Sequence, residues 1–224
     1  MHHIPTLLWL EMKRYRYTLS SFLMGISFYF LYLLLFQLGG LSSQPPLMLA
    51  TILWIGFILV QLLYGPLWFK EDNHSDCLFD LYIAGVSPRS IIIVKFGFYC
   101  IVQWGTFSVC FLLAAMSLGL TKPFIKILEI TLFIAIPIIS SILMVLNLTL
   151  IKVQHSFSLL ALLLFPLILP TSIVVLMAIK AFSQGWGEES FHYFIIAEIG
   201  LFLLTIPSCF LCATYLLRET LETI

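Results

Sequence analysis

Residues 17–69 read YTLSSFLMGISFYFLYLLLFQLGGLSSQPPLMLATILWIGFILVQLLYGPLWF and contain no charged side chain. A membrane-spanning helix needs roughly 20 mainly apolar residues, so this stretch is too long for a single span. Its centre, at residues 39–46, reads GGLSSQPP and is typical of a turn. The stretch therefore predicts two spans, at residues 19–38 and 47–68.

The rest of the chain has the same character. Of its 224 residues, 61% are hydrophobic and 10% are charged, whereas a soluble domain is about 45–50% apolar and about 25% charged. This composition excludes a soluble enzyme, a nucleic-acid-binding domain and a disordered chain. Four further spans are expected, at residues 91–118, 127–151, 157–179 and 194–217. The expected fold is all-α: one polytopic membrane domain over residues 1–224, with six transmembrane helices.

The basic residues of the loops predict the orientation. With six spans, eight of the 11 Lys and Arg residues lie on one side of the membrane and three on the other. Short loops rich in Lys and Arg face the cytoplasm. We therefore expect an integral protein of a bacterial or mitochondrial inner membrane, with both termini on the cytoplasmic or matrix side. Residues 6–16 carry Lys13 and Arg14 near their end and predict a short interfacial helix.

The longest polar segment is the inside loop at residues 69–90, which holds four of the 11 acidic residues. Within it, residues 75–85 predict a short amphipathic helix that Gly85 ends. Ser87 and Pro88 are typical of the cap and first turn of the next span. The apolar face of the short helix would either enter a groove on a partner or lie on the membrane surface, and the sequence favours neither. The residues assigned to this site are Glu71, Asp72, Asp76, Leu78, Asp80, Leu81 and Tyr82.

Polar side chains inside the spans are few. Glu198 lies about one turn into the last span and Glu129 lies near the end of the fourth. Both are expected to reach water at the membrane surface, so we expect no deep charge of the kind that a proton-coupled transporter uses. Gln61, Gln103 and Asn147 are expected to form hydrogen bonds between helices.

The fifth span contains Pro166 and Pro170, which remove two backbone donors four residues apart. A helix with two such gaps is expected to kink or break. The pair either marks a bend beside a transport pathway or is a structural kink, and we favour the kink.

The sequence contains no nucleotide-binding loop, no spacing typical of metal ligands and no catalytic arrangement of Ser, Cys or His. Cys209 and Cys212 have the spacing of a redox pair, but they lie inside an apolar helix, where packing is the favoured interpretation. We therefore expect no catalytic residue, no metal site and no stably bound cofactor.

Two stretches carry a resemblance to known proteins. In residues 54–95, FKED at 69–72 leads to Leu78-x-x-Leu81, to Ser-Pro at 87–88 and to a hydrophobic run. Residues 162–178 form a Leu-rich run that includes both prolines of the fifth span. With its six spans, the chain resembles the membrane subunit of an ABC-2-type transporter. It is most similar to the haem exporter protein B (cytochrome c maturation protein B) family, although the acidic-Gly pair common in that family is replaced by SDCLFD at 75–80.

The resemblance implies a non-catalytic, permease-like subunit whose short loop helix docks on a separate ABC ATPase subunit. ATP hydrolysis would then be coupled to haem delivery or to release of the haem chaperone, with haem as a handled ligand. Further membrane subunits of cytochrome c maturation and a second copy of the chain are implied partners. The alternatives are an ABC-2-type exporter of another substrate, a self-contained secondary transporter and a structural subunit of a respiratory complex.

Overall fold

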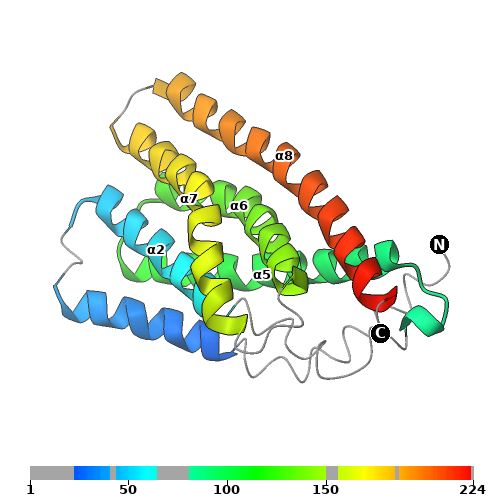
Figure 1. Cartoon of the computed structure of the whole chain (residues 1–224). Coiled ribbons are helices and arrows are strands. Elements are labelled where there is room, and N and C mark those ends of the chain that lie inside the picture. Colours follow the sequence, from blue (N-terminus) through cyan, green and yellow to red (C-terminus); the bar gives the residue numbers. More distant parts are fainter. Residues whose placement is uncertain (1–22, 41–43, 65–80, 150–155, 185–186, 223–224) are drawn as a thin grey trace.

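The computed structural model describes residues 23–40, 44–64, 81–149, 156–184 and 187–222 (Figure 1). Within these ranges the chain is helical and forms no strand. The helices are an apolar helix at Leu23–Leu38, α2 (Pro46–Tyr64), α5 (Pro88–Ser117), α6 (Lys122–Thr149), α7 (Ser156–Ser183) and α8 (Gly187–Glu222). The predicted all-α membrane fold is confirmed.

Five of these helices, α2 and α5 to α8, are long and apolar enough to cross a membrane. They correspond to the second to sixth expected spans. The helix at Leu23–Leu38 is the described part of the first expected span, whose residues 19–22 lie outside the described residues. The last helix is longer than expected, because α8 has 36 residues and continues beyond residues 194–217 at both ends.

The ends of the helices follow local sequence signals. The Ser87 hydroxyl accepts a hydrogen bond of 3.3 Å from the backbone N–H of Ser90, and Pro88 occupies the first turn of α5. This confirms the predicted cap. Proline suits the first turn because it lacks the N–H that the first turn would leave unpaired. Gly85 has a φ of 78°, and the N–H of Val86 donates to the Leu81 carbonyl at 3.0 Å. That pattern closes a helix with a left-handed residue, which glycine adopts without strain.

The centre of the bundle is α6. In an apolar 18-residue stretch of α6, 72% is buried inside the bundle, whereas the corresponding share for α8 is 6%. Figure 1 shows α8 running along the outside of the bundle. An apolar helix that is buried all round belongs inside a bundle, so α6 supports its neighbours while most of α8 faces outward.

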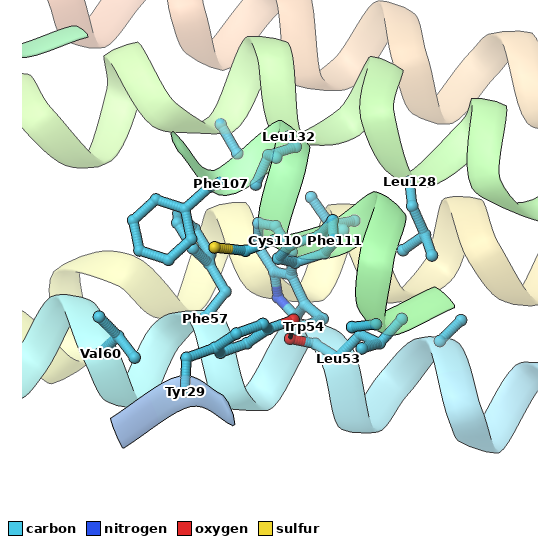
Figure 2. Close-up of a cluster of buried hydrophobic side chains, with 14 of the residues drawn as sticks. Tyr29, Leu53, Trp54, Phe57, Val60, Phe107, Cys110, Phe111, Leu128 and Leu132 are labelled. Carbon is cyan, nitrogen blue, oxygen red and sulfur yellow. Dashed lines mark hydrogen bonds between the residues drawn. The ribbon is translucent and has the colours of Figure 1, made fainter. Parts of the chain in front are cut away.

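An aromatic group fills the contact between the helix at Leu23–Leu38, α2 and α5 (Figure 2). Tyr29 stacks on Phe111, with ring centroids 5.8 Å apart. Phe57 meets Phe107 edge-to-face at 4.8 Å. The first described helix thus packs against the later helices through its tyrosine, because stacked and edge-to-face aromatic pairs add attraction beyond their buried area.

α7 continues as one helix from Ser156 to Ser183 with Pro166 and Pro170 inside it. Of the two expected outcomes, a kink or a break, the break does not occur, and the favoured kink stays a prediction. In lipid, a broken helix would expose several backbone groups that have no water to pair with, so the helix continues although two donors are missing. Both prolines are exposed, whereas Leu164 and Ile168 are buried, so the prolines lie on the outward face of α7.

Candidate functional site

The predicted partner-binding loop is described from residue 81 onward. Five of its assigned residues lie outside the described residues, namely Glu71, Asp72, Asp76, Leu78 and Asp80. Residues 81–83 are helical, and the helix ends at Gly85. Leu81 and Tyr82 are half-buried and pack against apolar side chains of the chain itself. These two residues therefore present only part of their surface to a partner.

The group that they contact joins the ends of three long helices, and we call it the loop-end cluster. Its buried members are Val86, Ile91, Ile92, Val94, Met144, Leu148, Ala213, Leu217 and Leu221. They come from the loop before α5, the start of α5, the end of α6 and the end of α8. Figure 1 shows the end of α8 beside the segment that precedes α5. The loop is thus packed onto the same end of the bundle as three of its helices.

Ile83 differs from its two neighbours, because 69% of its side-chain surface is exposed. It lies in the last helical residues before Gly85, at a position that the sequence analysis did not assign to the site. Its hydrophobicity is the signal that the sequence offers, although on a helix Ile83 lies off the face that Leu81 and Tyr82 form. Of the described loop residues, it is the large apolar side chain most available to another molecule.

A second polar arrangement lies inside the bundle, between α2, α5 and α6. The Gln103 amide nitrogen donates to the Gln61 side-chain oxygen at 2.9 Å and to the Tyr99 hydroxyl at 2.7 Å. The Ser140 hydroxyl donates to the Gln103 side-chain oxygen at 3.3 Å. Gln61 and Gln103 are both 1% exposed. The prediction that these two glutamines bond between helices is confirmed.

Asn147 does not share this role. Its amide nitrogen donates to the backbone carbonyl of Leu143, one turn earlier on α6, at 2.8 Å. The expectation of an interhelical bond for Asn147 is therefore wrong. The short asparagine side chain reaches its own helix backbone, and that local bond competes with any partner on another helix.

Two buried N–H groups on α2 have no acceptor among the described residues, the indole Nε1 of Trp54 and the side-chain Nε2 of Gln61. The two residues lie seven positions apart, so they project from the same face of α2. Figure 2 shows Trp54 within the aromatic group, close to Cys110 and Phe111. Burying these two donors without an acceptor lowers the free energy of unfolding.

Glu198 on α8 is the buried carboxyl group of the described bundle. The residue is 0% exposed, and neither carboxyl oxygen has a hydrogen-bond partner within the described part of the chain. The expectation that Glu198 reaches water at the membrane surface is therefore wrong. The sequence placed Glu198 about one turn into the last span, whereas α8 begins at Gly187, so Glu198 lies about three turns into the helix, and its side chain points into the bundle. The accompanying expectation of no deep charge concerns position across the membrane, which burial inside the bundle does not change, and it stays a prediction.

The surroundings of Glu198 follow from the register of three helices. The ring of Phe182 on α7 lies near those of Phe191 on α8 and Phe124 on α6, with ring centroids 6.3 Å and 5.1 Å apart. Seven residues, or about 10 Å, along each helix from this aromatic contact lead to Glu198, Val175 and Thr131. All three are 0% exposed. This register places Glu198 at the level of buried residues of α6 and α7.

The cysteines that the structure describes are free, and they do not form a site. Cys209 is half-buried and packs beside the core, whereas Cys212 is exposed. Cys77 lies outside the described residues. Over the described ranges, no group of three or more His, Cys, Asp or Glu side chains comes together as metal ligands would.

Two comparisons with known proteins bear on the family. The model of the CcmB protein family matches residues 4–215, which is nearly the whole chain. A search of curated proteins found no match. The family match covers every helix described above except the last residues of α8.

Proposed function

Because the chain belongs to the CcmB family, a membrane component of the ABC system for haem export and cytochrome c maturation, we propose that it couples a separate ATPase subunit to haem handling. In this proposal the ATPase docks at the loop before α5, on the side of the membrane that also holds both termini. Hydrolysis of ATP takes place on that partner. The chain contributes motion and a membrane framework, and it is not itself an enzyme.

The observation that carries this proposal is the loop-end cluster. Val86 of the loop, Leu148 of α6 and Leu217 of α8 are buried together in it, and Leu81 and Tyr82 pack on its surface. Close-packed side chains compress little, so a displacement of the loop is passed on to the helices that it contacts. A force applied at residues 81–86 would therefore move the ends of α5, α6 and α8 together.

Ile83 is the described residue best placed to receive such a force. Its exposed side chain lies beside Leu81 and Tyr82, which hold the segment to the bundle. An exposed apolar residue on a rigid support is what a groove in a partner protein binds. The acids of the loop, Asp76 and Asp80 among them, would add charge contacts to basic residues of the ATPase.

Haem enters this proposal as cargo. ATP-driven movement of the helices is coupled to haem delivery or to release of the haem chaperone, together with other membrane subunits of the maturation system. A second copy of the chain completes the complex. The outward faces of α7 and α8, which carry exposed side chains such as Pro166 and Leu211, are the surfaces left for that copy and for lipid.

The test is purification of the full chain together with its ATPase subunit. Replacing Ile83 with Glu places a charge at the proposed contact, and Leu78→Glu does the same further along the loop. Each is expected to lower the recovered ATPase about tenfold or more, which corresponds to about 1.4 kcal/mol of binding. Cytochrome c content in the same cells is expected to fall in parallel.

The matched control is Gln184→Glu, which adds the same charge at an exposed turn between α7 and α8, at the other end of the bundle. It is expected to leave both the ATPase and cytochrome c unchanged. If Ile83→Glu and Leu78→Glu retain as much ATPase as this control does, the loop is not the docking site.

A self-contained, proton-coupled transporter is the second candidate, and Glu198 is the observation in its favour. Buried carboxyl groups in membrane spans often belong to proton pathways. Substrate uptake by the purified chain alone in liposomes, driven by a proton gradient without ATPase or nucleotide, would support that candidate against the first.

A further inference from the structure

The Glu198 side chain points into the bundle, whereas apolar side chains near it on α8 point outward. Around it, Ile196, Ile199, Leu203 and Leu204 are 62%, 41%, 65% and 70% exposed, whereas Glu198 is 0% exposed. The other buried side chains described on α8, at Ala213, Leu217 and Leu221, belong to the loop-end cluster. Over its first half, then, several apolar side chains of α8 point outward, and Leu201 and Phe202 are only partly buried against the core, whereas the Glu198 side chain is fully buried.

The helices packed against this part of α8 offer the carboxyl group little compensation. On α6 the charged residues are Lys122 and Lys126, which are exposed, and Glu129, which is half-buried. On α7 the charged residue is Lys180, also exposed. None of these forms an ion pair or a hydrogen bond with Glu198.

The remaining neighbours are accounted for in the same way. On α8 itself, Glu188 and Glu189 lie in the first turn of the helix, and His192 and Tyr193, which are exposed, follow them. α5 meets α8 at the loop-end cluster, at the other end of the bundle. The Thr131 hydroxyl, at the same level as Glu198, donates to the backbone carbonyls of Ile127 and Leu128 on its own helix. No donor among the described residues is therefore directed at the Glu198 oxygens.

An ionised carboxylate in this place would be buried without any partner, which is among the most costly arrangements in a protein interior. A neutral carboxyl group avoids most of that cost. The geometry therefore favours a site whose occupant is a proton.

We propose that Glu198 is a proton-binding group that stays neutral while α8 packs against α6 and α7, and whose loss of the proton separates the first half of α8 from these helices. In the step itself, the carboxyl O–H bond breaks, its electron pair stays on the carboxylate and water takes up the proton. The carboxylate then requires water, and it can reach water only if α8 moves or rotates. This inference does not depend on the ATPase or on haem.

The inference is tested on the full chain in lipid nanodiscs by infrared spectroscopy. A buried, protonated carboxyl group has a carbonyl-stretch band that is separate from those of ionised carboxylates. In neutral buffer we expect this band in the wild-type protein and expect it to disappear in Glu198→Gln. The control is Glu129→Gln, which removes a half-buried carboxyl group from the neighbouring helix and is expected to retain the band.

Amide hydrogen exchange over residues 194–204 tests the coupling to helix packing. In neutral buffer, wild type and Glu198→Gln are expected to exchange at the same rate. In alkaline buffer the wild type is expected to exchange faster than the variant at the same pH, with the ratio rising about tenfold per pH unit above the titration of the carboxyl group. Comparison at equal pH removes the intrinsic effect of pH on exchange.

Either of two results overturns the proposal. The first is a wild-type spectrum in neutral buffer without the protonated carboxyl band, or with a band that persists in Glu198→Gln. The second is equal exchange of α8 in wild type and variant in both buffers. Glu198→Met provides a second neutral side chain of similar length, so the comparison survives if the glutamine variant does not fold.

Discussion

Replacing Gln103 with Leu tests whether the polar arrangement between α2, α5 and α6 holds these helices together. The substitution introduces an apolar side chain of similar size. It removes the hydrogen bond that Gln103 donates to Gln61 at 2.9 Å and the one that it accepts from Ser140 at 3.3 Å. Both of these connect different helices. The bond to Tyr99, four residues away on α5, is lost as well.

The expected cost follows from these two interhelical bonds. A side-chain hydrogen bond between membrane helices contributes about 0.6 kcal/mol on average and up to about 1.7 kcal/mol. Two such bonds give about 1–3 kcal/mol, and the Gln61 oxygen left without its donor places the result in the upper part of that range. The free energy of unfolding of the full chain in bicelles, measured by steric trapping, is expected to fall by this amount.

Asn147→Leu is the matched control, because it also replaces an amide with Leu inside a membrane helix but removes only a bond to the helix's own backbone. It is expected to change the free energy of unfolding by less than about 0.5 kcal/mol. A double-mutant cycle of Gln61→Leu and Gln103→Leu then isolates the pair. The reasoning fails if Gln103→Leu costs no more than Asn147→Leu, or if the two glutamines show no coupling.

Three glycines give further predictions. Gly56→Ala is expected to lower the free energy of unfolding by about 1–3 kcal/mol, because the added Cβ would lie 2.6 Å from a ring carbon of Tyr32 and 3.0 Å from one of Tyr29. Gly97→Ala, with nothing within 4 Å, is expected to be neutral or stabilising in the same measurement. Gly85→Ala is expected to cost about 1 kcal/mol, because φ there is 78°, and hydrogen exchange is expected to rise over residues 81–87; an unchanged exchange rate would contradict this.

Much of the architecture could be predicted from the sequence because lipid allows few solutions. A run without charges must be helical where it crosses the membrane, so the positions of the spans follow from length and hydrophobicity. The ends of the loop before α5 were also predictable, because Gly85, Ser87 and Pro88 each supply a local backbone property. The interhelical hydrogen bonds of Gln61 and Gln103 were predictable because amides in a membrane have few other partners, but the sequence did not predict that the two bond to each other.

What could not be predicted is the direction in which a side chain points. In a helix whose apolar residues surround the whole circumference, hydrophobic periodicity does not distinguish an inward face from an outward face. The sequence could therefore show that Glu198 lies within the last span, but it could not show that the side chain is buried, because burial depends on where α6 and α7 lie. The only sequence signal was the acid itself, alone in an apolar span.

The same ambiguity affected the loop and Asn147. Leu81 and Tyr82 were correctly identified as apolar surface, but sequence alone could not show that part of this surface covers the chain's own helix ends. For Asn147, a bond to the carbonyl four residues earlier competes with any partner on another helix. In the loop, tertiary packing decides which part of the apolar surface is covered, whereas for Asn147 a local bond to its own helix decides the partner.

The slight burial of α8 has a consequence for how the chain is made. The helices leave the ribosome in sequence order, and the central helix α6 precedes α7 and α8. By the time α7 has entered the membrane, the aromatic group and the hydrogen bonds of Gln103 have all of their members. α8 then arrives at a nearly finished bundle and packs on it through Leu201, Phe202, Glu198 and the loop-end cluster. A helix that joins last and has few fully buried side chains can separate from the bundle without unfolding the rest. The late arrival of α8 and the proposed movement of its first half therefore both depend on this weak attachment.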